Sequence, residues 1–178
     1  ANLRSLMTEE PRQAEVMIDR LIVYLRSALA ASRTESTTLA GEFAQLRAYL
    51  DIMSIRMGTR LTYRLDLPAA LETAAIPPML LQPIVENAIK HGIEPKVGAG
   101  SIEVLARRGA AGIEIQVNDS GLGLPPEGGA SEMPQSAGGS YGLVHVRERL
   151  QAVYGAGASM QIRPRSPNGV SATITIPE

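Results

Sequence analysis

The chain has 178 residues, of which 44% are hydrophobic, enough for one ordinary domain or a small domain with a helical appendage. Its formal net charge of −1 gives no electrostatic basis for binding nucleic acid or an anionic membrane surface. The sequence has no cysteine, which excludes disulfides and thiolate metal sites within it. There is no signal peptide and no apolar run of membrane-span length. We therefore expect the cytoplasmic piece of a longer protein, whose membrane anchor would precede residue 1.

Residues 1–58 predict two helices. Thr8 is expected to cap the first, which extends to about Ala31 and carries two apolar stripes. After a polar loop over residues 32–38, Thr38 is expected to cap a second helix that ends at Gly58. The stripes are formed by Met17, Leu21, Tyr24 and Ala28 and by Ile18, Ile22, Leu25 and Leu29. The second helix has a heptad seam of Leu39, Phe43, Leu46, Leu50, Met53 and Met57.

Two such helices joined by a short loop predict an antiparallel hairpin that cannot bury its apolar faces alone. The seam and the two stripes offer more apolar surface than one α/β domain can cover. We therefore expect a homodimer through the hairpin, in which two chains form a four-helix bundle.

Residues 59–178 predict an α/β domain. Alternating apolar residues indicate strands at 61–67, 102–106, 113–117, 159–164 and 170–176, the second and third forming a hairpin. Helices are expected after residues 77–78, extending to about His91, and over 141–154. We expect these helices on one face of a mixed sheet. The stretch 124–140 is rich in Gly, Pro, Ser and Ala, and so long a loop is typically functional; residues 125–139 are expected to be poorly ordered without a ligand.

The first chemical cluster lies at the end of the first of these helices. Asn87, Lys90 and His91 are spaced i, i+3 and i+4, which predicts that they share one helix face. An amide oxygen, an ammonium and an imidazole together can bind a metal, a phosphate and a planar ring. In isolation, such a pattern more often marks a solvated helix face that ends at a glycine, here Gly92.

The second cluster, residues 117–124, directly follows a predicted strand. The Asp119 carboxylate can accept a hydrogen bond from an exocyclic amine, and Gly121 and Gly123 allow backbone to approach a flat ligand. When this cluster is taken alone, an ordinary turn after a strand is the better interpretation.

The third cluster is the glycine-rich stretch 138–143, which leads into a helix. Free N–H groups at a helix N-terminus attract phosphate. A flexible linker would have the same composition, because a lone glycine run is weakly specific.

The order and spacing of these clusters resemble the GHKL nucleotide fold, shared by histidine kinases, gyrase-type ATPases and Hsp90. The segments 77–83, 85–92, 141–143, 146–150 and 169–177, with the second helix over 46–60, are similar to LytS-type sensor kinases. The resemblance covers nearly the whole chain. It implies an α/β two-layer sandwich of the Bergerat type over residues 59–178, preceded by a partial dimerisation hairpin over residues 1–58.

The resemblance also implies ATP and Mg²⁺ as ligands. Asn87 would coordinate Mg²⁺ and, with Lys90 on a phosphate, form the catalytic pair. His91 would lie against the nucleoside, and Asp119 would accept a hydrogen bond from the adenine amino group. Residues 124–140 would be a lid over the triphosphate. The remaining nucleotide contacts would come from Gly121, Gly123, Gly139, Tyr141, Gly142 and Leu143.

Four positions depart from the family pattern. Pro83 stands four residues before Asn87, where the GHKL ATPases carry the glutamate that activates water, which argues against hydrolysis and for transfer to a side chain. Ser140 replaces a frequent glycine and is expected to stiffen the lid hinge. Val170 replaces a threonine, which removes a hydroxyl near the phosphates, and His145 replaces an asparagine without a consequence that we can derive.

The function implied by the resemblance is ATP-dependent phosphoryl transfer to a histidine and then to the aspartate of a response regulator. The family's acceptor histidine lies in a segment just before the first helix, and the chain opens at Ala1, after that segment. His91 and His145 are poor substitutes, so we expect this piece to bind ATP without phosphorylating itself. Two alternatives stay open: a GHKL ATPase that uses hydrolysis for conformational change, and a non-catalytic dimerisation module. Phosphate release and nucleotide titration would discriminate between them.

Overall fold

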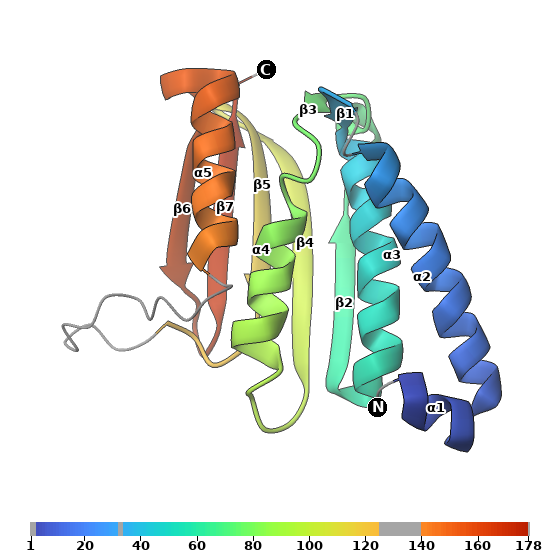
Figure 1. The fold of residues 1–178 in the computed structure, drawn as a ribbon. Helices are drawn as coiled ribbons and strands as arrows, with labels where there is room; N and C mark the ends of the chain where they lie inside the picture. The colour runs from blue at the N-terminus through green and yellow to red at the C-terminus, as the bar shows by residue number, and fades with distance from the viewer. Residues whose placement is uncertain (1–2, 32–33, 125–139, 178) are drawn as a thin grey trace.

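The computed structural model describes residues 3–31, 34–124 and 140–177, and Figure 1 shows a helical hairpin beside a sheet with two further helices. The helices are α1 (Leu3–Glu9), α2 (Pro11–Ala31), α3 (Leu39–Met57), α4 (Gln82–Asn87), the π-helix η3 (Ala88–Ile93) and α5 (Ser140–Tyr154), with 3-10 turns η1 (Gly58–Arg60), η2 (Ala69–Leu71) and η4 (Gly155–Gly157). The strands are β1 (Thr37–Thr38), β2 (Leu61–Asp66), β3 (Ala75–Ile76), β4 (Gly100–Gly109), β5 (Gly112–Asp119), β6 (Ser159–Pro164) and β7 (Val170–Ile176). The predicted lid residues 125–139 lie outside the described residues.

The ends of the first helices follow local signals, with one correction. The Thr38 hydroxyl accepts a hydrogen bond from the Gly41 N–H at 3.1 Å, and Gly58 ends α3 with a φ of 59°, as predicted. The prediction that Thr8 begins the first long helix is wrong, because Thr8 lies inside α1. The junction falls at Glu10, whose carbonyl accepts the first hydrogen bonds of α2, and Pro11 then occupies the first helical position, where no N–H is needed.

The sheet is mixed, as expected. Its order is β2-β4-β5-β7-β6, with β2 parallel to β4 and the other neighbours antiparallel. Buried and more accessible side chains alternate along β4 and β5, so that one face carries the core. In Figure 1, α4 and α5 lie over one face of this sheet. The sequence did not predict the short antiparallel pair β1–β3, which joins the start of α3 to residues 75–76.

The heptad seam of α3 is buried within the chain itself. Leu39, Phe43, Leu46, Leu50 and Met53 belong to one hydrophobic cluster with the buried residues of the sheet, α4 and α5. Two of them, Leu39 and Leu50, have no exposed surface. The part of the dimer prediction that rested on this seam is therefore wrong, because the α/β domain of the same chain already covers it.

The two stripes of α2 have different surroundings. Met17, Leu21, Tyr24 and Ala28 are half-buried, and the Tyr24 ring lies 6.0 Å from that of Tyr49 on α3. The other stripe faces outward and is 37–62% exposed; it consists of Ile18, Ile22, Leu25 and Leu29. Its spacing of four, three and four residues is that of a helix-packing seam. Among the described helices, none is both long and apolar enough to cross a membrane.

Candidate functional site

The first cluster lies on a helix that changes its winding. α4 was expected to end near His91, but the helical chain continues to Ile93, and from Ala88 onward it is a π-helix. The Glu94 N–H donates to the Ile89 carbonyl at 2.8 Å, a bond that spans five residues. Single π turns inside α-helices occur frequently at functional sites.

The π winding replaces the simple α-helical spacing on which the first cluster was predicted. The burial pattern nevertheless separates two sides of this helix. Asn87 is half-buried and Lys90 and His91 are exposed, whereas the side facing the core consists of Ala88, Ile89, Gly92 and Ile93. The three candidate ligand-binding side chains are thus on the part of the helix that remains accessible.

The second cluster centres on a buried carboxylate. Asp119 ends β5 and is only 4% exposed. Its Oδ1 accepts the Gly121 N–H at 2.7 Å. Burial raises the pKa of Asp119, while the backbone N–H groups of Gly121 and Val170 and the positive charges of Arg165 and Lys96 lower it. The carboxylate is therefore desolvated but oriented by backbone donors, as suits a group that recognises one hydrogen-bond donor of a ligand.

The first two clusters are in direct backbone contact. A Cβ added at Gly121 would lie 2.4 Å from both the carbonyl carbon and Cα of Gly92, so only glycine fits there. The Leu122 N–H donates to the Gly92 carbonyl at 3.2 Å. In turn, a Cβ at Gly92 would lie 3.0 Å from Asp119 Oδ1. The end of η3 and the turn after β5 therefore form one continuous surface, the wall of the candidate site.

The start of β7 completes this wall from the other side. Gly169 has a φ of 109°, and a Cβ there would lie 2.0 Å from the Asp119 carbonyl oxygen. Gly123, with a φ of 86°, lies next to Gly169. The sequence indicated Gly169 only as the start of the family-like segment 169–177, and the structure adds that this glycine is a steric requirement of the Asp119 turn.

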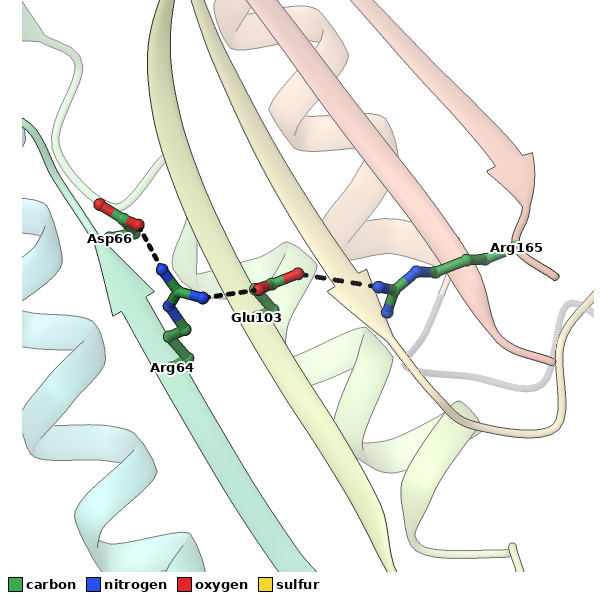
Figure 2. A network of polar contacts seen from close by, with 4 residues as sticks. All are labelled: Arg64, Asp66, Glu103 and Arg165. Atoms are coloured by element: carbon green, nitrogen blue, oxygen red, sulfur yellow. Dashed lines mark hydrogen bonds and ion pairs between the residues drawn. The ribbon is translucent and has the colours of Figure 1, made fainter. Parts of the chain in front are cut away.

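Arg165 supports the same turn. Its backbone N–H donates to the Gly169 carbonyl at 3.0 Å, and its guanidinium lies 3.7 Å from Glu103 on β4. Figure 2 shows this pair on the side of the sheet away from the helices, where Arg64 links Glu103 (3.8 Å) to Asp66 (2.8 Å). A shallow cavity of about 250 Å³ is lined by Arg64, Glu103 and Arg165, so it lies away from the three clusters. Exposed ion pairs contribute little stability, so the backbone hydrogen bond to Gly169 is the contact of Arg165 that supports the turn.

The third cluster, at the beginning of α5, contacts the beginning of α4. A Cβ at Gly142 would lie 3.3 Å from Cβ of Pro83 on α4, and Leu143 is buried in the core. Pro83, which stands where the related ATPases carry the glutamate that activates water, therefore packs against the predicted lid hinge. Gly139 lies outside the described residues, and Tyr141 is described only as part of α5.

Two basic residues that the sequence patterns did not single out support the wall. Lys96 Nζ donates to the Ser120 carbonyl at 2.6 Å, next to Asp119. Arg60 donates to the carbonyls of Glu94 at 3.1 Å and Lys96 at 2.7 Å, which holds the turn after η3. Arg60 lies in η1 before β2 and Lys96 in the turn after η3, and neither belongs to a periodic sequence pattern.

The described side chains suit a metal ion that binds together with a phosphate-containing ligand. The described residues include no group of three or more His, Asp or Glu side chains that could chelate an ion. Mg²⁺ keeps several waters and is commonly bound through few protein oxygens and the phosphates of a nucleotide. The half-buried amide of Asn87 fits that requirement.

Residues 78–178 match the family model of the histidine kinase-, DNA gyrase B- and HSP90-like ATPases. The chain belongs to this ATPase family. Residues 1–61 match the model of histidine kinases. The chain is 34% identical to the sensor histidine kinase YpdA of Escherichia coli, over 88% of this chain and 27% of the relative. It is 27% identical to the sensor protein LytS of Bacillus subtilis, over 98% of this chain and 30% of the relative.

The predicted relation to LytS-type sensor kinases is thus confirmed, and the chain spans less than a third of the length of these relatives. Solved structures of histidine kinase domains also share the fold. The histidine kinase domain of a blue-light activated kinase from Erythrobacter litoralis superposes with a TM-score of 0.59 at 16% identity, covering 98% of this chain and 83% of that one. The nucleotide-free catalytic domain of the histidine kinase ThkA gives 0.61 at 17% identity, covering 81% and 98%. The predicted two-layer α/β sandwich with preceding helices is confirmed.

Proposed function

We propose that the chain is the ATP-binding kinase portion of a sensor histidine kinase. The observation that carries this proposal is the meeting of three clusters that are far apart in sequence. Gly92 packs against Gly121 at the end of η3, and Gly142 packs against Pro83 at the start of α4, so the Asp119 turn and the start of α5 contact the two ends of one continuous helical segment. A nucleotide there would have a buried hydrogen-bond acceptor at one end and a helix N-terminus at the other.

The roles of the side chains follow from their chemistry. Asp119 would accept a hydrogen bond from the adenine amino group, and Gly121 and Gly123 would leave room for the ring. His91 would lie against the nucleoside, and Lys90 would neutralise a phosphate. Asn87 would hold Mg²⁺, which supplies charge neutralisation when bound. The start of α5, with Gly139, Tyr141, Gly142 and Leu143, would close the phosphate end.

In the proposed reaction, the γ-phosphoryl group passes to an imidazole nitrogen of a histidine in the full protein, and ADP leaves. Such transfer depends on positioning and charge neutralisation rather than on a protein nucleophile in the pocket. Pro83 cannot activate water, so we expect transfer rather than hydrolysis. A response regulator would then accept the phosphoryl group on an aspartate.

Calorimetric titration of the 178-residue chain with ATP and ADP, with and without Mg²⁺, tests the nucleotide proposal. Saturable binding that Asp119→Asn weakens supports it, and heats equal to buffer dilution contradict it. Steady-state phosphate release in the full-length protein then discriminates kinase from ATPase. Rapid continuous release without phosphohistidine would favour the ATPase alternative.

We also propose that the protein is a homodimer through the hairpin, with the outward stripe of α2 as the contact. The exposed residues Ile18, Ile22, Leu25 and Leu29 have the spacing of a bundle seam, and the α3 seam is already covered. The dimer would act in the cytoplasm, with any membrane anchor in another part of the full protein.

A further inference from the structure

Glu42 on α3 is an almost fully buried carboxylate, only 2% exposed. Glutamate is seldom buried to this degree without partners. Its oxygens accept the backbone N–H groups of three consecutive residues, Met79 at 2.6 Å, Leu80 at 3.0 Å and Leu81 at 3.1 Å. These donors stand directly before α4, whose N-cap residue, Leu81, has no side-chain capping hydrogen bond. The capping group of α4 therefore comes from the hairpin helix α3.

The backbone bends at Met79, so that the three N–H groups of residues 79–81 point toward the Glu42 carboxylate. Met79 has a φ of 56°, in the left-handed region that non-glycine residues seldom adopt. Successive N–H groups in such a bend form a concave anion-binding nest. A strained residue of this kind persists only where its surroundings hold it, and the Glu42 carboxylate is the group that does so here.

A second polar contact joins the same helices one turn further along. Gln45 Nε2 donates to Gln82 Oε1 at 2.9 Å, and both side chains are buried. Gln82 Nε2 in turn donates to Glu86 at 2.7 Å and to the Tyr24 hydroxyl on α2. Both hairpin helices are therefore hydrogen-bonded to α4. Apolar packing alone would allow small sliding, whereas buried hydrogen bonds fix one register.

We propose that Glu42 is a positioning residue for the nucleotide site, acting through the N-terminal end of α4. This inference rests on the proposed function. α4 continues without interruption into η3, so the place where Glu42 holds its first turn determines the position of Asn87 and Lys90. Movement of α3 in the hairpin would then change nucleotide affinity, and bound nucleotide would bias the hairpin by the same factor.

The test compares ADP affinity in the presence of Mg²⁺ for the 178-residue chain and its variants, at a temperature where each is folded. Glu42→Gln is isosteric but places an amide donor against backbone donors, and we expect Kd to rise by roughly 5- to 150-fold, the usual range of coupling between sites. Glu42→Asp keeps the charge and should recover part of the affinity. Ile176→Val, at the end of β7 that pairs with Ile113, is the control that lowers stability and leaves the hydrogen bonds of Glu42 unchanged.

Unchanged ADP affinity in folded Glu42→Gln, or an equal loss in the Ile176→Val control, would overturn the proposal. If Glu42→Gln does not fold, Gln45→Leu decides by the same criterion. If the native chain binds no ADP, the proposed function fails, and hydrogen exchange decides separately about Glu42. Selective loss of amide protection over residues 84–91, with β4 and β5 still protected, supports the positioning role, and uniform loss contradicts it.

Discussion

Gly121→Ala tests whether the contact between the first two clusters is a steric requirement. The added Cβ would lie 2.4 Å from two atoms of Gly92 and 2.6 Å from a third, all of them backbone. Carbon contacts are optimal at about 3.5–4.0 Å, so the η3 end and the Asp119 turn must separate by about 1 Å. Overpacking of this kind costs about 1–3 kcal/mol. For a chain of this size, that corresponds to a fall in Tm of about 2–12 °C.

The same displacement would disturb the wall of the candidate site, so ADP affinity should fall together with Tm. Circular dichroism melts and calorimetric titration measure the two effects. Gly155→Ala is the matched control, because Gly155 has a φ of 56° and no atom within 4 Å of the added Cβ. The control should lower Tm through backbone strain and leave ADP binding intact. Native Tm and native ADP affinity in Gly121→Ala would refute the steric reasoning.

Three further changes probe the same contacts. Asp119→Asn should weaken ADP binding by about 1–3 kcal/mol in calorimetry, because an amide can present a donor to the adenine amine. Burial raises the pKa of Asp119, so the contribution of this residue to the free energy of unfolding is largest below pH 3.8 and is lost as pH rises. At neutral pH the Asn variant, which carries no charge, should therefore melt no lower than the native chain. Lys96→Met should weaken ADP binding severalfold, since the bond to the Ser120 carbonyl beside Asp119 is lost, and an unaltered titration would exclude this support. Replacing both Ile22 and Leu25 by Asp should yield monomers by sedimentation without loss of helix, whereas Leu50→Asp should unfold the chain; dimers that survive the double change would exclude the α2 stripe.

Local patterns were sufficient to predict most elements of the sheet. β6 and β7 have the predicted bounds, and β2 differs at one end, because strict alternation of apolar and polar residues is typical of half-buried strands and of little else. The π winding of η3 was not predictable, since residues 88–93 have apolar residues at positions that suit either helix type. The separate α1 was missed because Thr8 offers a plausible cap, and only Pro11 indicates the actual start of α2.

The candidate site was predictable only as three separate clusters. The sequence indicated Asp119 and its glycines, but not that Gly92 would be the surface against which Gly121 packs. Close contact between distant backbones leaves no periodic signal. The surroundings of α3 were also misjudged. A heptad seam shows that a helix packs along one line, but it does not show whether the partner is another chain or the sheet of the same chain.

The burial of the α3 seam determines where this protein can be shortened. A polypeptide that began at Gly58 would uncover the sheet and α4 side chains that pack on Leu46 and Leu50, and it would lose the carboxylate that caps α4. It would also lose β1 as the partner of β3. The smallest autonomously folding unit that retains the wall of the candidate site therefore begins before Thr37 and includes α3. Removal of α2 from that unit would cost the buried Ala14, the half-buried stripe that packs on α3 and the hydrogen bond from Gln82 to the Tyr24 hydroxyl.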